Sequence, residues 1–364
     1  MRRWVKYKVS LKYLVVALLI ATIGLFLTKI TIVKKPTDYY QLQYRAAQIM
    51  SQAIEAISKE RKVRQIPINK QLDPNGTGLI GEEYNELTTT LGNLDAKRTS
   101  TNPDFAALMV KYFQQAGLKS GDVIAIGSSG SFPALLLATL SASKVMGIIP
   151  LTIYAIGASE YGANIPDFTF IDMLKVLNER NILDYKLAAV SMGGNQDQAK
   201  GLFFPESKKT IMDIAKRSGV YLIDTGELAT NIQKRLDIYR KEAGGKQIKL
   251  FVNIGGASAN FGDTNQSLNL PNGLVFQVSE TPASTARGLV FEFLELKIPI
   301  IHLLNIRDLS IKNGIPIDPI PLPGIGQSEV FFKYNYQKWI IILTILSAAG
   351  VLIKFKNKNN YELK

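Results

Sequence analysis

Two uncharged, strongly apolar runs lie near opposite ends of the chain, and shorter apolar runs alternate with amphipathic segments between them. Residues 13–27 and residues 339–353 contain no charged side chain. A membrane-spanning helix needs roughly 20 apolar residues, so both runs are short, and flanking lysines such as Lys12 and Lys29 would have to reach toward the headgroups. The pattern predicts one transmembrane helix at each terminus.

Each apolar run has a second interpretation. The first could be the apolar part of a cleaved signal peptide, but Thr28, Lys29 and Ile30 follow it where a small-residue cleavage site would stand. The second could be a buried C-terminal helix, but it is apolar on every face and ends in a lysine-rich tail. Membrane anchoring at both ends is the favoured prediction, and cleavage of the first span stays open.

Between the two ends, the pattern is typical of an α/β protein. Continuous apolar runs bounded by turn residues predict buried parallel strands, and the segments between them have helical periodicity. The predicted strands are residues 122–126, 148–156, 187–191, 220–223, 248–254 and 298–304. The predicted helices are residues 103–117, 133–144, 167–181, 206–218, 227–242 and 283–296. We expect a mostly parallel, doubly wound sheet of about six strands.

The same pattern divides the chain into five segments. They are a cytoplasmic tail and anchor (1–35), a helical stalk (36–100), an extracytoplasmic α/β domain (101–314), a Pro-rich linker (315–337), and a transmembrane helix with a basic cytoplasmic tail (338–364). Within the stalk, residues 38–62 carry an apolar stripe at helical spacing, and residues 81–91 are expected to form a further helix.

Net charge supports this topology. The chain carries a formal net charge of +13, and residues 1–35 and 333–364 together account for all of it, which leaves residues 36–332 neutral. Basic residues that flank a membrane span stay in the cytoplasm, so both termini are predicted inside and the α/β domain outside. A neutral domain also argues against nucleic acid as a partner. The chain contains no cysteine, so the exported domain must be held together by its core.

Loops rich in Gly, Ser and Asn follow several predicted strands. In open α/β sheets, ligands bind beyond the carboxyl ends of the strands, and Gly/Ser loops there offer backbone N–H groups to a carboxylate or phosphate. We therefore expect a site for an anionic ligand at this edge. The predicted binding residues are Gly127, Ser128, Ser129, Gly130, Ser131, Gly193, Gly194, Asn195, Gly255, Gly256, Ser258 and Asn260.

No cofactor or metal ligand is predicted. The loop at residues 127–131 lacks the G-x-G-x-x-G spacing of dinucleotide sites and the Gly-Lys-Ser/Thr of phosphate-binding loops. Zinc is disfavoured because the chain has one histidine and no cysteine. Strand-end carboxylates such as Glu160 and Asp197 leave an oxygen-ligated Mg²⁺ or Ca²⁺ open in principle, but their spacing defines no site.

Catalysis by a serine is an open alternative. Ser128, Ser129 and Ser131 lie at a strand-to-helix turn, where hydrolases place a nucleophile, although the G-x-S-x-G pattern is absent. Any Ser-His-acid triad would have to use His302, the one histidine. His302 lies within an apolar strand, where a histidine is more often a packed residue. The residues therefore leave open whether the protein is an enzyme.

Four segments together resemble the poly-gamma-glutamate system protein family. They are GSSGSFPALLLATLSASK (127–144), GASEYGANIPDFTFIDM (157–173), SMGGNQDQAKGLF (191–203) and VNIGGASANFGD (252–263). The resemblance implies an accessory role in synthesis or export of capsular poly-γ-glutamate at a bacterial cytoplasmic membrane, with the polymer or synthase subunits as partners. It implies no catalytic residues. An extracytoplasmic serine-dependent γ-glutamyl or envelope hydrolase or transferase, and a ligand-sensing scaffold, remain alternatives.

Overall fold

The computed structural model describes residues 11–361, and the chain divides into two compact units. We call them the two-helix unit (Met1–Thr37 with Phe332–Lys364) and the globular unit (Asp38–Phe331). The basic residues predicted in the N-terminal tail at positions 1–10 lie outside the described residues.

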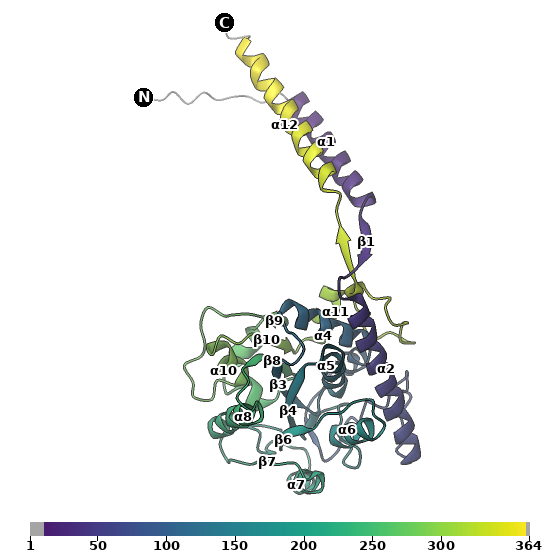
Figure 1. Ribbon diagram of the computed structural model, residues 1–364, viewed down its shortest axis with the longest axis vertical. Coiled ribbons are helices and arrows are strands. Elements are labelled where there is room, and N and C mark those ends of the chain that lie inside the picture. Colours follow the sequence, from purple (N-terminus) through teal and green to yellow (C-terminus); the bar gives the residue numbers. More distant parts are fainter. Residues whose placement is uncertain (1–10, 362–364) are drawn as a thin grey trace. The chain divides into compact units, whose positions relative to one another are not determined.

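The two-helix unit brings segments from both ends of the chain together (Figure 1). Strand β1 (Val33–Pro36) pairs antiparallel with β11 (Phe332–Asn335), and helix α1 (Leu11–Ile30) packs along α12 (Lys338–Tyr361). The helices approach closely at Gly24, where an added Cβ would lie 2.2 Å from Cγ2 of Thr344. Only a residue without a side chain permits this approach.

A membrane-spanning helix was predicted at each terminus. Within the described residues, the helix near the N-terminus is long and apolar enough to span a membrane. By length and composition, α1 could cross a membrane, although a signal sequence near an N-terminus meets the same criterion. Over its described residues, α12 does not meet it. The part of α12 whose side chains are described, residues 338–354, is shorter than the roughly 20 residues that a membrane span needs.

The globular unit is built on a seven-stranded, mostly parallel sheet, which confirms the predicted α/β class (Figure 1). Six strands run parallel, and the edge strand β9 is antiparallel to β10. In spatial order the strands are β7 (Leu222–Ile223), β6 (Leu187–Ser191), β4 (Ile149–Ala155), β3 (Val123–Ser129), β8 (Ile248–Ile254), β10 (Ile300–Leu303) and β9 (Gly273–Val275).

All six predicted strands are present. The three residues of β9 escaped prediction because they lie in a polar connection with no apolar run long enough to indicate a strand. A separate two-stranded ladder joins β2 (Thr88–Thr90) to β5 (Ala158–Ser159).

Helices cover both faces of the sheet. On one face lie α2 (Tyr40–Val63), α4 (Asp104–Gln115), α5 (Pro133–Met146) and α6 (Phe170–Glu179), which pack on one another. Helices α8 (Leu228–Glu242) and α10 (Leu289–Glu295) pack into a hydrophobic core on the other face. There the rings of Phe251 and Phe293 stack at 4.6 Å. The remaining helices are α3 (Leu94–Ser100), α7 (Ser207–Ser218), α9 (Ser258–Phe261) and α11 (Ile306–Asn313), with short 3-10 turns at Asn265–Asn269 and Glu329–Phe331.

Two helix predictions were wrong in part. Residues 81–91 form turns and β2, because the side chain of Asn85 accepts the N–H of Leu87 and its backbone accepts that of Thr88, which favours a turn over a helix. The helix predicted at 283–296 begins only at Leu289, after Gly288 with a φ of 91°. Helix α3 lies within the segment predicted as a helical stalk, but no separate helix was predicted at its position.

The strand order creates a switch point beside β3. From β3 the chain moves through β4, β6 and β7 toward one edge, and β8 and β10 then fill the other side. The connections that leave β3 and β8 therefore diverge to opposite faces, which opens a crevice at the carboxyl ends of these two strands.

Candidate functional site

A cavity of about 420 Å³ lies at this switch point, beyond the carboxyl ends of the central strands. Loops that follow β3, β4, β6 and β8 converge on it, together with β2 and the residue after it. Its lining residues are Thr89, Thr90, Leu91, Ser129, Ser131, Phe132, Gly157, Ser159, Gly193, Gly194, Asn195, Gly256, Ala257 and Ser258. We call this cavity the edge pocket.

Glycines allow the loops to approach closely enough to enclose the edge pocket. Gly193 has a φ of +79°, and a Cβ on it would lie 3.0 Å from the backbone nitrogen of Gly157. The N–H of Gly157 donates to the carbonyl of Met192 at 2.9 Å. The loops after β4 and β6 thus meet backbone to backbone, which side chains at either glycine would prevent.

The lining of the edge pocket is polar but carries no charged side chain. It offers hydroxyl groups, the amide of Asn195, and backbone from Gly194 and Gly256. Within residues 11–361, the N–H groups of Gly256 and Ala257 donate no hydrogen bond. Hydroxyl and backbone N–H donors at a concave glycine-rich surface suit a carboxylate or a phosphate.

A buried ion pair holds the loop after β6 in place. Arg235 on α8 and Asp197 are each 1% exposed, and their charged atoms lie 2.6 Å apart. Asp197 also accepts the backbone N–H of Gly193 and the hydroxyl of Ser191, each at 2.8 Å. The guanidinium donates further to Asn231 at 2.8 Å, so both charges are well satisfied. This pair fixes the backbone that lines one side of the edge pocket.

Lys97 on α3 lies directly behind the edge pocket and is 2% exposed. Its Nζ lies 2.6 Å from Oγ of Ser159, contacts the carbonyl oxygen of Ser131, and sits 4.0 Å from the centre of the Phe132 ring. Burial lowers the pKa of Lys97 to about 7, and the attraction of Glu160 opposes this shift. Near neutral pH this amine is therefore poised between its charged and neutral forms.

Direct hydrogen bonds connect the serines around Lys97. The backbone N–H of Ser159 donates to Oγ of Ser131 at 2.9 Å, and that of Ser131 lies 3.4 Å from Oγ of Ser129. The loops after β3 and β4 therefore form one hydrogen-bonded wall of the edge pocket.

The structure brings together about half of the predicted site residues. Lining the edge pocket are Ser129, Ser131, Gly193, Gly194, Asn195, Gly256 and Ser258; outside its lining are Gly127, Ser128, Gly130, Gly255 and Asn260. Gly127 and Ser128 belong to β3 itself, which runs three residues beyond its predicted end. The side chain of Asn260 is buried and donates to the carbonyl of Gly127 at 2.9 Å.

His302 does not line the edge pocket either. It is fully buried in β10, with Nδ1 3.0 Å from the side-chain nitrogen of Asn253 and its ring against Phe261. Burial lowers its pKa to about 4, so the ring is neutral at physiological pH. No hydrogen bond joins His302 to Ser128, Ser129 or Ser131 within the described chain.

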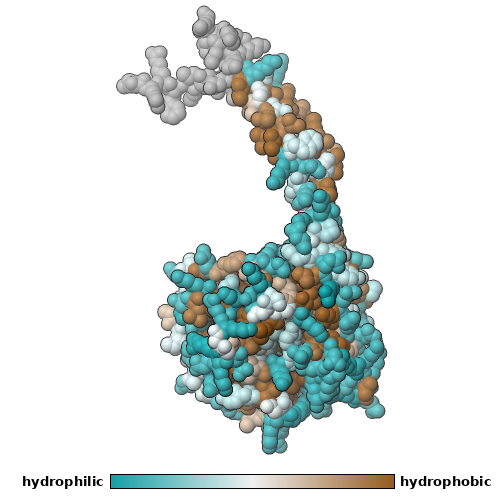
Figure 2. Space-filling model, viewed as in Figure 1, coloured by the Kyte–Doolittle hydropathy of each residue, from teal (hydrophilic) through white to brown (hydrophobic). Residues whose placement is uncertain are grey.

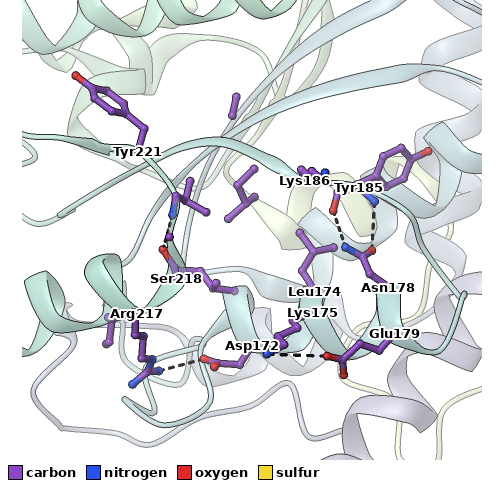
Figure 3. Close-up of a pocket in the computed structure, with 16 residues that line it drawn as sticks. Asp172, Leu174, Lys175, Asn178, Glu179, Tyr185, Lys186, Arg217, Ser218 and Tyr221 are labelled. Carbon is purple, nitrogen blue, oxygen red and sulfur yellow. Dashed lines mark hydrogen bonds and ion pairs between the residues drawn. The ribbon is translucent and has the colours of Figure 1, made fainter.

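A second, larger hollow of about 770 Å³ lies between α6 and α7 (Figure 3). Several of its polar side chains are paired with one another or with backbone: Arg217 with Asp172 at 3.3 Å, and Asn178 with the backbone of Tyr185 at 2.7 and 3.2 Å. The edge pocket is the better candidate site, because it lies at the switch point and its lining includes Gly256 and Ala257, whose N–H groups donate no hydrogen bond within the described residues.

Comparison of the chain with protein-family models, curated proteins and solved structures found no match. Function is therefore inferred from the geometry of the edge pocket.

The Arg235–Asp197 pair yields a stability prediction. Replacing Arg235 with Met leaves Asp197 as a buried, unpaired charge, and we expect unfolding in urea to need about 3–5 kcal/mol less free energy. The matched control Arg240→Met breaks the exposed pair with Asp237 and should cost at most about 1 kcal/mol. Equal losses in the two variants would show that the buried pair does not hold the loop.

Proposed function

We propose that this chain is a membrane-anchored protein whose globular unit binds an anionic, carboxylate-bearing ligand or polymer in the edge pocket. The observation that carries the proposal is the convergence of four strand-end loops on one cavity lined by hydroxyls and glycine backbone. The lining is electrically neutral, so carboxylate recognition would be local and would depend on hydrogen bonds.

The proposed ligand is poly-γ-glutamate, and the proposed role is accessory to its synthesis or export for a bacterial capsule. This polymer presents a carboxylate at every residue, so successive groups could occupy the edge pocket in turn. Subunits of the polymer synthase are the proposed protein partners. The support is the sequence resemblance together with the donors of the edge pocket.

We further propose that α12 is a second membrane span and that both termini are cytoplasmic. Within the two-helix unit, large apolar side chains of both helices point outward, including Leu25 at 72% exposed and Leu346 at 62% (Figure 2). Such a continuous apolar surface is costly in water and is expected in lipid.

A serine-dependent γ-glutamyl or envelope hydrolase or transferase is the second candidate function. The observation in its favour is that several serine hydroxyls line the edge pocket, among them Ser129 and Ser131. A ligand-sensing scaffold would use the same pocket without chemistry.

Binding tests the proposed ligand. We expect the full-length protein in detergent to bind γ-linked glutamate oligomers, measured by calorimetry, and not their methyl esters. Gly256 has ordinary space for a Cβ, with Leu304 4.0 Å away, so Gly256→Val should fill the pocket without strain and weaken binding at least about tenfold. The control Ala283→Val, at an exposed position outside the edge pocket, should bind normally. Equal binding of the esters would contradict carboxylate recognition.

Reporter fusions test the membrane topology. Alkaline phosphatase, which is active only outside the cytoplasm, should be active when fused after Asn75 in the globular unit and inactive when fused after Lys364. The fusion after Lys364 should be inactive because α12 returns the chain across the membrane to the cytoplasm. Activity at both positions would show that α12 does not span the membrane.

A further inference from the structure

Ser159 differs from the other pocket serines in having an amine beside its hydroxyl. Its Oγ lies 2.6 Å from Nζ of Lys97, within the reach required of a general base. Ser159 is 6% exposed and is one of the residues that line the edge pocket. Within residues 11–361, the hydroxyls of Ser129 and Ser131 have no titratable side chain hydrogen-bonded to them.

Both groups of this pair are held in place by backbone contacts. The N–H of Ser159 donates to Oγ of Ser131, and β5 pairs with β2, so the nucleophile sits on a fixed strand. Nζ of Lys97 also contacts the carbonyl of Ser131. A neutral amine can donate one hydrogen to that carbonyl while its lone pair accepts the hydroxyl proton of Ser159.

We propose that Ser159 and Lys97 form a serine–lysine dyad that cleaves an amide bond of a ligand held in the edge pocket. Ser159 is the nucleophile and Lys97 is the general base, which replaces the predicted pairing of Ser128, Ser129 or Ser131 with His302. For its substrate class, a γ-linked glutamyl amide, the inference rests on the proposed function.

The proposed reaction is hydrolysis through an ester intermediate. Oγ of Ser159 bonds to the amide carbonyl carbon while its proton passes to the neutral Nζ of Lys97. The tetrahedral intermediate expels the amine, which takes that proton, and an ester to Ser159 remains. Water then attacks the ester and gives a proton to Lys97, which returns it to Oγ of Ser159 as the carboxylic acid leaves.

The surroundings of Lys97 determine the pH at which its amine loses a proton. Burial favours the neutral amine, and Glu160, the carboxylate that acts on it, favours the charged form. Glu160 is itself engaged by the N–H of Gly92 at 2.7 Å. The positive charge of Arg98, the next residue on α3, is paired with Asp318. The base form should therefore increase as pH rises through about 7.

Covalent labelling of the full-length protein tests the dyad without assuming its substrate. A fluorophosphonate should form one adduct, located at Ser159 by mass spectrometry, as Oγ displaces fluoride. Ser159→Ala should abolish it, and Lys97→Met should slow it at least about 100-fold. The wild-type rate should rise with pH to a plateau above about 7, and Lys97→Met should lose this dependence.

Matched controls lie outside the edge pocket. Lys111→Met removes a half-buried lysine whose pKa is also lowered by burial, and Ser310→Ala removes a buried serine whose hydroxyl has no hydrogen-bond partner among the described residues. Both should label at the wild-type rate. Three results would overturn the dyad: an adduct at another serine, no adduct at pH 8, or a wild-type labelling rate that does not depend on pH. The last two are measured on the wild-type protein, so they remain valid even if Lys97→Met does not fold.

Oligomer cleavage then separates the dyad from the proposed function. Wild-type protein should shorten γ-linked glutamate oligomers, and Ser159→Ala should bind but not shorten them. If the protein binds the oligomers but Ser159 is not labelled and the oligomers are not cleaved, the dyad is overturned and the proposed binding function remains. Labelling of Ser159 without oligomer binding would keep the dyad and overturn the proposed ligand.

Discussion

The architecture of the candidate site depends on one buried amine. Lys97 is 2% exposed and contacts Ser131 and Ser159, which come from loops after two different strands. Removing an ammonium group from water is costly, so the protein must either satisfy it fully or hold it neutral. Here a carbonyl, a hydroxyl and the face of Phe132 surround it, and its pKa falls to about 7. The burial of Lys97 thus has two consequences. It ties Ser131 and Ser159 together in the pocket wall, and it lowers the pKa of the amine so that the amine could act as a base.

Binding and catalysis are compatible uses of this pocket. The lining supplies neutral hydrogen-bond donors for carboxylates, while the amine stays behind the lining and out of the cavity. A protonated Lys97 would favour an anionic ligand, and a neutral Lys97 would activate Ser159. The balance between the two forms falls near physiological pH because burial and Glu160 act in opposite directions.

The sequence predicted the parallel strands well because buried strands read as uninterrupted apolar runs, and their carboxyl ends had to meet at one edge. Of the residues that this argument selected, Ser129, Ser131, Gly193 and Gly256 line the edge pocket. It missed Lys97, because α3 lies some 30 residues before the loop that it contacts and a single lysine there gives no periodic signal. Arg235 was missed for the same reason, since its partner Asp197 is 38 positions away in the chain.

Direct titration of Lys97 is the most decisive test of this account. Lysine side chains labelled with ¹⁵N can be followed by NMR across pH in the full-length protein, and the Lys97 signal is assigned by its loss in Lys97→Met. The account predicts that this amine gives up its proton near pH 7. A Lys97 signal that stays protonated through pH 9 would contradict it, because a permanent ammonium group cannot accept the proton of Ser159.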